Sequence, residues 1–251
     1  MSPATQVRVL GIGMGPQHVT PEVADALRGC DYVLAAEKRD EDGLLAARRA
    51  IADAYGVELV AVPDAERDRS PDSTGAEAGY QRAVRDWHEA RVNAYERVLR
   101  ERGGTAAFLV WGDPSLYDST IRIVERLAQR RGISYDVLPG ISAPQLLAAR
   151  HRVVLHPVGA PVHVTTARRL RDDLAAGQTN VCVMLTGTLD LDDLDDWSIW
   201  WGANLGTDSE ELVAGRVGDV LGPIHAARDR AKAAAGWVMD VYLLRAPEVR
   251  A

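Results

Sequence analysis

Short apolar runs alternate with amphipathic segments along this chain, and the alternation restricts its fold more than any other feature. VRVLGIG (residues 7–13) is typical of a buried strand that runs into a glycine turn, and Thr20 followed by a proline and a glutamate predicts a helix that ends near Arg28. The order of strand and helix then recurs, with strands predicted at CDYVLAA, VELVAVP, TAAFLVW and ISYDVLPG and helices at GLLAARRAIADAYG, 118–131 and 142–152. Such alternation favours a parallel sheet covered by helices.

A long amphipathic helix is predicted over residues 76–102. Apolar side chains recur there at steps of three and four residues from Tyr80 onward, and at 1.5 Å per residue the helix is roughly 40 Å long. Thr74 with Glu77 resembles a capping box at its start. The charged segment 64–73, which contains a proline and follows another, is predicted to be a loop.

The cluster HPVGAP (156–161) is the best candidate for a domain boundary, because its two prolines and its glycine interrupt both periodicities. We therefore predict an N-terminal α/β domain over residues 1–156, which contains the long helix, and a C-terminal α/β domain over 157–251. In the second domain, strands are predicted at VHVTT, NVCVML, EELVAGRVG and WVMDVYLLR, and helices at 168–177 and 219–236. The acidic stretch LDLDDLDDW is interpreted as a solvated face, so no metal site is predicted.

Composition excludes several classes of function. A formal net charge of -7 argues against a nucleic-acid partner held by a basic face, since phosphate affinity comes from clustered Lys and Arg. The two cysteines lack CxxC spacing, which suggests neither a disulfide framework nor a zinc site and fits a cytoplasmic protein. The longest apolar run is far shorter than the roughly 20 residues of a membrane span, and we expect no signal segment.

Glycines follow the first predicted strand in GIGMG (11–15). A glycine turn between a strand and a helix lets the backbone approach a ligand closely, as in dinucleotide-binding loops. The spacing here is GxGxG, without the third glycine of the GxGxxG fingerprint. A structural turn and a nicotinamide site both remain open on this motif.

Two further loops are expected at the same sheet edge. WGDP follows the strand TAAFLVW, and LPGISAP follows the next strand. Ligands bind outside the carboxyl ends of parallel strands, so their position favours a binding function. The alternative is that Asp113 or Ser115 merely caps the next helix.

The long helix contains WHEAR, which combines aromatic area, a titratable group and a cation within about one turn. A histidine such as His88 is more often structural than catalytic. Many arginines must be solvated, yet a polycarboxylate ligand would use some of them as bidentate partners. There is no nucleophile elbow and no P-loop, so hydrolase and kinase functions lose support.

These motifs together resemble the tetrapyrrole (precorrin) methyltransferases. The shared pattern consists of GIGMGPQHVT, FLVWGDPSLYD and PGIS in that order. Longer blocks carry a closer likeness, namely WHEARVNAYERV, AFLVWGDPSLYDSTIRIVE, LPGISAPQLLAARHRV, WWGANLGTDSEELVAGRVGDV and GWVMDVYLLR. The resemblance covers nearly the whole chain and implies two α/β domains of the tetrapyrrole methylase type, with the active site in the cleft between them.

The resemblance also implies S-adenosyl-L-methionine as the cofactor and a set of residues near it. Those carried over by matching motifs are Gly13, Met14, Trp111, Gly112, Asp113, Leu116, Ser142, Ala143, Met184, Leu185 and Gly206. Many relatives have GxGPGDP at the first turn, whereas Met14 stands here at the proline position and one residue is missing before Pro16. A carboxylate role at that turn therefore cannot be carried over.

The closer likeness implies methylation of precorrin-5 at ring carbon C-1 with release of acetate. Methyl transfer needs positioning, whereas acetate release needs a general base, for which Asp118, Tyr117 and His88 are the candidates, with Glu37 behind them. Candidates for the polycarboxylate tetrapyrrole substrate are Arg91, Arg150, Arg168, Trp87 and Tyr80. The family also implies a homodimer. Another precorrin methyltransferase, a nicotinamide-dependent oxidoreductase and a non-catalytic tetrapyrrole-binding protein remain as alternatives.

Overall fold

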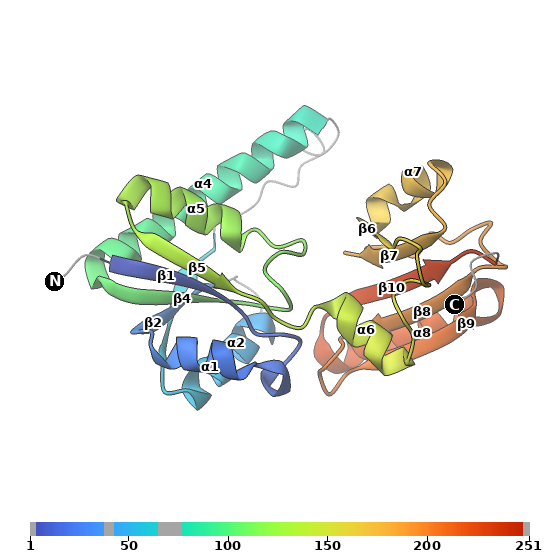
Figure 1. The fold of residues 1–251 in the computed structure, drawn as a ribbon, viewed down its shortest axis with the longest axis horizontal. Helices are drawn as coiled ribbons and strands as arrows, with labels where there is room; N and C mark the ends of the chain where they lie inside the picture. The colour runs from blue at the N-terminus through green and yellow to red at the C-terminus, as the bar shows by residue number, and fades with distance from the viewer. Residues whose placement is uncertain (1–3, 38–42, 65–76, 248–251) are drawn as a thin grey trace. The chain divides into compact units, whose positions relative to one another are not determined.

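The computed structural model describes residues 4–37, 43–64 and 77–247, and the chain divides into two compact units (Figure 1). Unit 1 comprises Met1–Ile141 and unit 2 comprises Ser142–Ala251. The sequence favoured a boundary at HPVGAP, some residues further along. The structure divides earlier because helix α6 packs on the strands of unit 2.

Unit 1 is built on a parallel five-stranded sheet in the order β3-β2-β4-β1-β5. Its described elements are β1 (Ala4–Gly11), η1 (Pro16–His18), α1 (Pro21–Arg28), β2 (Tyr32–Glu37), α2 (Gly43–Ala54), β3 (Glu58–Pro63), α4 (Glu77–Arg102), β4 (Gly104–Val110), α5 (Thr120–Arg131) and β5 (Ser134–Leu138). The parallel sheet and its covering helices are confirmed. The predicted loop 64–73 lies outside the described residues except for Asp64, as does Thr74 of the predicted capping box.

Alternating side chains of the strands bury both faces of this sheet. On one face Val7 and Val9 pack with residues of α4 and α5, and on the other Leu10 and Ile12 pack with residues of α1 and α2. Figure 1 shows the two pairs of helices on opposite faces. Because helices cover both faces of a parallel sheet of this kind, the ends of its strands are not covered, and the loops there are available for binding.

Unit 2 carries a mixed sheet in the order β6-β7-β10-β8-β9. Only β6 and β7 run parallel, and the other neighbours are antiparallel. Its described elements are α6 (Ala143–His151), β6 (His163–Thr166), η2 (Ala167–Arg169), α7 (Leu170–Ala175), β7 (Asn180–Met184), β8 (Ser198–Ala203), β9 (Glu211–Arg216), α8 (Val217–Ala235) and β10 (Asp240–Arg245). β8 was not predicted from the sequence.

The core of unit 2 lies between the sheet and α8. Trp201 and Tyr242 are its largest fully buried side chains, and Ile224 and Ala227 of α8 pack in the same cluster. The acidic stretch contributes Leu191 to this core while its aspartates are exposed, which confirms the predicted solvated face.

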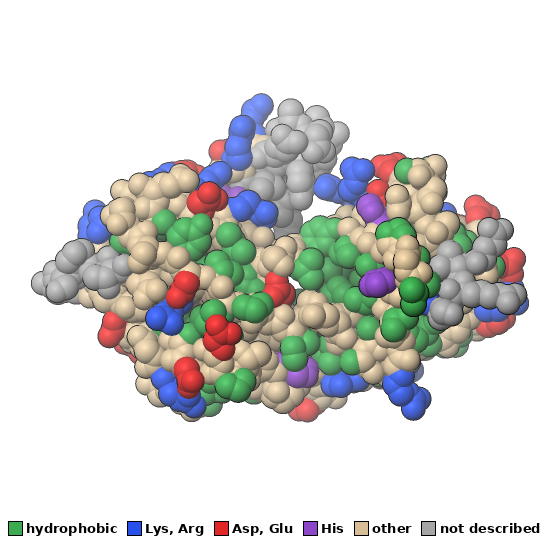
Figure 2. Space-filling view, viewed as in Figure 1, with side chains coloured by type: hydrophobic (Ala, Val, Ile, Leu, Met, Phe, Trp, Pro, Cys, Tyr) green, Lys and Arg blue, Asp and Glu red, His purple; other side chains and the backbone are tan. Residues whose placement is uncertain are grey.

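Charges of both signs are mixed over the face of the molecule drawn in Figure 2, where Lys and Arg side chains are interspersed with Asp and Glu. Among the helices that the structure describes, none combines the length and apolar character that crossing a membrane requires. The two cysteines are buried and unpaired, and burial raises the pKa of Cys30 to about 11.

Three loops of unit 1 meet through their backbones at the carboxyl edge of the sheet. A Cβ atom at Gly140 would lie 2.2 Å from the carbonyl oxygen of Gly112, and one at Gly11 would lie 2.4 Å from the backbone nitrogen of Gly140. Only glycine fits at these positions, because the neighbouring atoms are backbone and have no rotamer with which to move away.

We predict that Gly140→Ala destabilises the protein by about 2 kcal/mol, because the new methyl group forces the loops apart. The melting temperature should fall by roughly 4–8 °C. Gly29→Ala is the matched control in the same unit, since its Cβ would meet its nearest neighbour at 3.5 Å. Equal melting temperatures for the two variants would contradict the close approach.

Candidate active site

The loop after β4 is joined to the loops after β1 and β5 by hydrogen bonds. Gly13 and Gly112 exchange two backbone hydrogen bonds, of 3.2 and 2.8 Å, in an isolated bridge. Gly13 has a φ of 65°, in the left-handed region that favours glycine. Asp113 Oδ2 accepts a hydrogen bond of 3.0 Å from the backbone N–H of Gly140. The sequence prediction that WGDP and PGIS lie close together is confirmed.

The second carboxylate oxygen of Asp113 is also occupied. It accepts hydrogen bonds from the backbone N–H of Ser115 at 2.8 Å and from the Ser115 hydroxyl. Burial raises the pKa of Asp113, but the hydrogen bonds from Ser115 and Gly140 outweigh it, so the pKa lies below its ordinary value of 3.8. Asp113 is thus an ionised acceptor that fixes loop shape, and it is poorly suited to take up a proton.

The residues after this turn differ in their exposure. Tyr117 has a φ of 50°, rare for a side chain of this size, and is 45% exposed. Asp118 Oδ1 accepts a 2.6 Å hydrogen bond from the backbone N–H of Thr120, which places it at the start of α5. The predicted helix therefore begins two residues later than Asp118.

Met14 is buried, and the indole Nε1 of Trp111 is buried without a hydrogen-bond partner in the described chain.

Arg91 of α4 lies beside the end of β3, where it contacts a carboxylate and an aromatic ring. Arg91 donates to both oxygens of Asp64, with Nε and Nη2 each 2.6 Å from an oxygen, and its guanidinium lies 4.0 Å from the centre of the Trp87 ring. His88 is buried, with its ring 5.2 Å from that of Trp87. The side chain of Tyr80 lies outside the described residues.

The charge of Asp118 also affects the pKa of Arg91. Burial lowers the pKa of Arg91, whereas the hydrogen bond to Asp64 and electrostatic interactions with Tyr95, Asp64 and Asp118 raise it, with a net increase. The contacts thus bring Trp87, His88 and Arg91 together, and the charge of Asp118 acts on Arg91 from the start of α5. Sequence reasoning named these four and missed Asp64, whose position at a strand end was the available signal.

Arg48 was also missed. It projects from α2 and donates from Nε to the carbonyl oxygen of Leu109 at 2.8 Å. That carbonyl lies beyond the short stretch over which β2 pairs with β4, at residues 32–33 and 106–107. The guanidinium of Arg48 thus lies where β2 and β4 cease to pair. The hydrophobic periodicity of the sequence did not indicate this contact.

In unit 2 the predicted cofactor residues lie at helix and strand ends and in the loop between β8 and β9. Ser142 caps α6 in a capping box with Gln145, and Ala143 follows as the first helical residue. Met184 ends β7, and Leu185 has a φ of 56° with 60% of its surface exposed. Gly206 donates its backbone N–H to Glu210 at 2.7 Å.

The other arginines predicted for the substrate have different surroundings. Arg150 donates to Glu210 at 2.8 Å, so one carboxylate holds both Arg150 and the Gly206 loop. Arg168 lies in the short helix η2. The roles predicted for Arg91, Arg150 and Arg168 in binding substrate stay predictions. Within the ranges that the structure describes, no group of three or more His, Cys, Asp or Glu side chains is arranged to hold a metal ion.

The fold and the loops define an α/β protein with a parallel-sheet unit whose loops at the carboxyl edge are joined mainly through backbone, followed by a mixed-sheet unit. The family model of the tetrapyrrole (corrin/porphyrin) methylases matches residues 6–221, and the chain belongs to this family.

Two individual relatives are similar over nearly their whole lengths. The precorrin-6A synthase (deacetylating) of a Sinorhizobium species is 41% identical, over 96% of this chain and 95% of that protein. The crystal structure of a cobalamin synthesis related protein (CobF) from Corynebacterium diphtheriae is 34% identical, covers 98% of this chain and 100% of that one, and has a TM-score of 0.81.

A more distant relative shares the fold alone. It is the uroporphyrin-III C-methyltransferase of Thermus thermophilus, solved in complex with S-adenosylhomocysteine. It is 17% identical, covers 97% of this chain and 98% of that one, and has a TM-score of 0.57. Together the comparisons show a homologue of precorrin-6A synthase with the tetrapyrrole methylase fold.

Asp113→Asn is predicted to reduce the loss of stability in acid. Because the folded-state pKa of Asp113 is lowered, its contribution is present in full above about pH 4 and is lost as the pH falls through that lower pKa. The difference in melting temperature between pH 7 and pH 3 should be smaller in Asp113→Asn than in the wild type. An unchanged difference would argue against an ionised Asp113 in the folded protein.

Arg91→Met should destabilise the protein by about 3 kcal/mol, because it leaves the buried carboxylate of Asp64 without its partner. Adding Asp64→Leu should recover more than half of the loss, which urea unfolding would measure. Arg102→Met is the control on the same helix, since its ion pair with Glu58 is exposed and should matter little. A double variant as unstable as Arg91→Met would refute a charge-based cause.

Proposed function

We propose that this protein is an S-adenosylmethionine-dependent C-methyltransferase of corrin-ring biosynthesis, which methylates precorrin-5 at C-1 and releases acetate to give precorrin-6A. The observation that carries the proposal is 41% identity to a precorrin-6A synthase over 96% of the chain. The reaction consumes precorrin-5, S-adenosylmethionine and water, and it yields precorrin-6A, S-adenosylhomocysteine and acetate. A homodimer and a cytoplasmic location belong to the same proposal.

The described residues fit such a cofactor. Bound S-adenosylmethionine supplies an electrophilic methyl group, so the protein has to supply position and a dry surface more than a reactive side chain. In unit 1 we assign the cofactor to the joined loops through Gly13, Met14, Trp111, Gly112, Asp113 and Leu116. In unit 2 we assign it to Ser142, Ala143, Met184, Leu185 and Gly206.

The loops of unit 1 take their shape from contacts within the protein. The two bonds between Gly13 and Gly112 and the acceptor role of Asp113 need no ligand. The cofactor thus meets a preformed backbone surface, which reduces the entropy lost on binding.

Acetate release requires water to add to the acetyl carbon and a base to take a proton from that water. The bond from the acetyl carbon to the ring then breaks and leaves its electron pair on the conjugated ring, which balances the methyl cation that the ring receives. Asp118 fits the base better than His88 does. One of its oxygens accepts from the backbone N–H of Thr120, and no described residue donates to the other. His88, in contrast, is only 7% exposed. Tyr117 is exposed beside Asp118 and is the second candidate.

The function is tested with purified protein, precorrin-5 and S-adenosylmethionine. We predict one acetate and one S-adenosylhomocysteine for each precorrin-6A formed. Methylation without acetate would indicate another precorrin methyltransferase of the family. Binding of NAD(P) in place of S-adenosylmethionine, measured by calorimetry, would indicate an oxidoreductase.

Asp118→Asn is predicted to slow acetate release by about a hundredfold, the lower end of the usual contribution of a general base. The asparagine oxygen can still accept from Thr120, so the affinity for S-adenosylhomocysteine should stay within about twofold of the wild type. Asp53→Asn, at an exposed position of α2, is the control for loss of a carboxylate. Wild-type acetate release by Asp118→Asn in a single turnover would exclude the residue as the base.

A further inference from the structure

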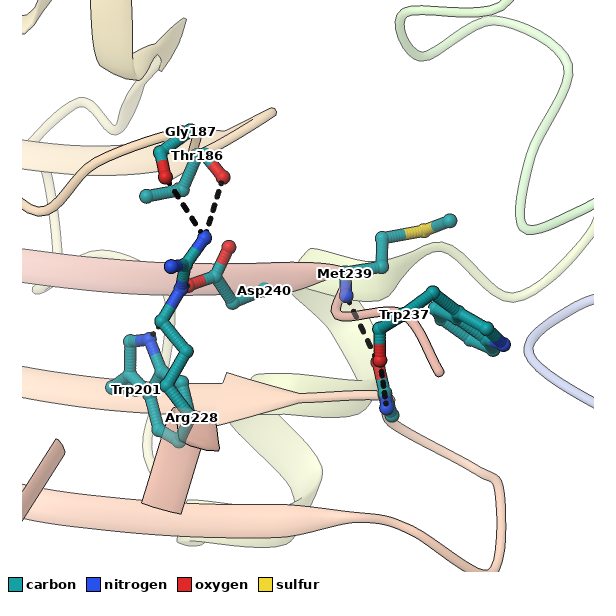
Figure 3. Close-up of polar contacts among 8 residues, drawn as sticks. Thr186, Gly187, Trp201, Arg228, Trp237, Met239 and Asp240 are labelled. Atoms are coloured by element: carbon teal, nitrogen blue, oxygen red, sulfur yellow. Dashed lines mark hydrogen bonds and ion pairs between the residues drawn. The ribbon is translucent and has the colours of Figure 1, made fainter. Parts of the chain in front are cut away.

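One arginine of α8 holds the turn that follows β7. Arg228 Nη2 donates to the carbonyl oxygens of Thr186 and Gly187, at 3.2 and 2.9 Å (Figure 3). Both acceptors lie directly after the exposed Leu185. A cation that binds two successive carbonyls fixes the orientation of two successive peptide planes.

Arg228 is itself fixed by a buried acceptor. Its Nε donates to Asp240 Oδ2 at 3.1 Å, and the indole Nε1 of Trp201 donates to the same oxygen at 3.2 Å (Figure 3). The side chain of Asp240 is completely buried, and that of Arg228 is 24% exposed. The turn is thus connected to the core of unit 2 through one ion pair.

The orientation of the carbonyls determines that of the amides. In a trans peptide the C=O and N–H bonds point in opposite directions. Since the carbonyls of Thr186 and Gly187 point at Arg228, the N–H groups of Gly187 and Thr188 point away from it. Both residues are exposed, and no described residue accepts from either N–H.

Two features mark this turn as a binding element. Leu185 keeps a left-handed backbone and exposes a large apolar side chain, an arrangement that stable cores avoid and that ligand sites use. Two outward N–H groups follow it directly, and successive amides of this kind bind acceptor atoms.

We propose that Arg228 is a positioning residue for cofactor binding, which holds the turn 185–188 so that the amides of Gly187 and Thr188 donate to acceptor atoms of S-adenosylmethionine. The proposal rests on the proposed function and adds a residue that does not itself touch the cofactor. It also extends the site beyond Met184 and Leu185.

The amides are tested with a matched pair of variants in the full-length protein. Thr188→Pro removes the N–H, and Thr188→Ala removes the side chain but keeps the N–H. Calorimetry should show the affinity for S-adenosylhomocysteine reduced at least about tenfold in Thr188→Pro and changed less than about twofold in Thr188→Ala. Equal affinities for the two variants would overturn the proposal.

The arginine is tested with a second pair on the same helix. Arg228→Met should raise the KM for S-adenosylmethionine about tenfold and change kcat less, and Arg228→Lys should recover part of the loss. Arg230→Met is the control, since Arg230 pairs with Glu211 on the surface. If Arg228→Met does not fold because Asp240 loses its partner, Arg228→Met with Asp240→Asn is used instead.

The two proposals fail in different ways. A wild-type protein that binds no S-adenosylhomocysteine overturns the proposed function. A wild-type protein that binds it, with unchanged affinity in Arg228→Met, overturns the positioning role alone.

Discussion

The contact between three backbone loops at the carboxyl edge of unit 1 is the constraint on which the rest of the candidate site depends. Gly140 lies so close to Gly11 and Gly112 that no side chain fits. The carboxylate of Asp113 then joins the second and third loops through the Gly140 amide. The contact depends on the strands, because their parallel order brings these three loops to one edge of the sheet. The glycines and the aspartate convert that proximity into a fixed shape.

Three arginines discussed above are each paired with a carboxylate of their own unit. Arg91 is paired with Asp64, Arg150 with Glu210 and Arg228 with Asp240. A buried guanidinium or carboxylate without a partner is costly, so the pairs of Arg91 and Arg228 follow from burial, whereas the pair of Arg150 is exposed. An arginine near a proposed polycarboxylate site is therefore not automatically a ligand for carboxylates. Its existing partner has to be known before its role is assigned.

The sequence predicted most of the fold because the elements of unit 1 obey simple periodicities. β8 was missed because SIWWGA is short, lacks clear alternation and lies between an acidic stretch and a glycine turn. Its burial comes from pairing with β10, which is distant in sequence, and with β9, the next strand along the chain. The mixed order of the second sheet was hidden for the same reason.

The candidate site was predictable to a similar degree. Glycine and Asp-Pro turns identified the loops because backbone geometry requires those residue types locally. Arg48 and Arg228 gave no local signal, since their partners are a carbonyl of another strand and a turn. Asp64 had only its position at a strand end as a signal, because its partner lies on a helix. A candidate site built mainly from backbone thus has two kinds of residue, which differ in how they can be found. The glycines appear as motifs, whereas the side chains that orient the backbone appear only once the fold brings them to it.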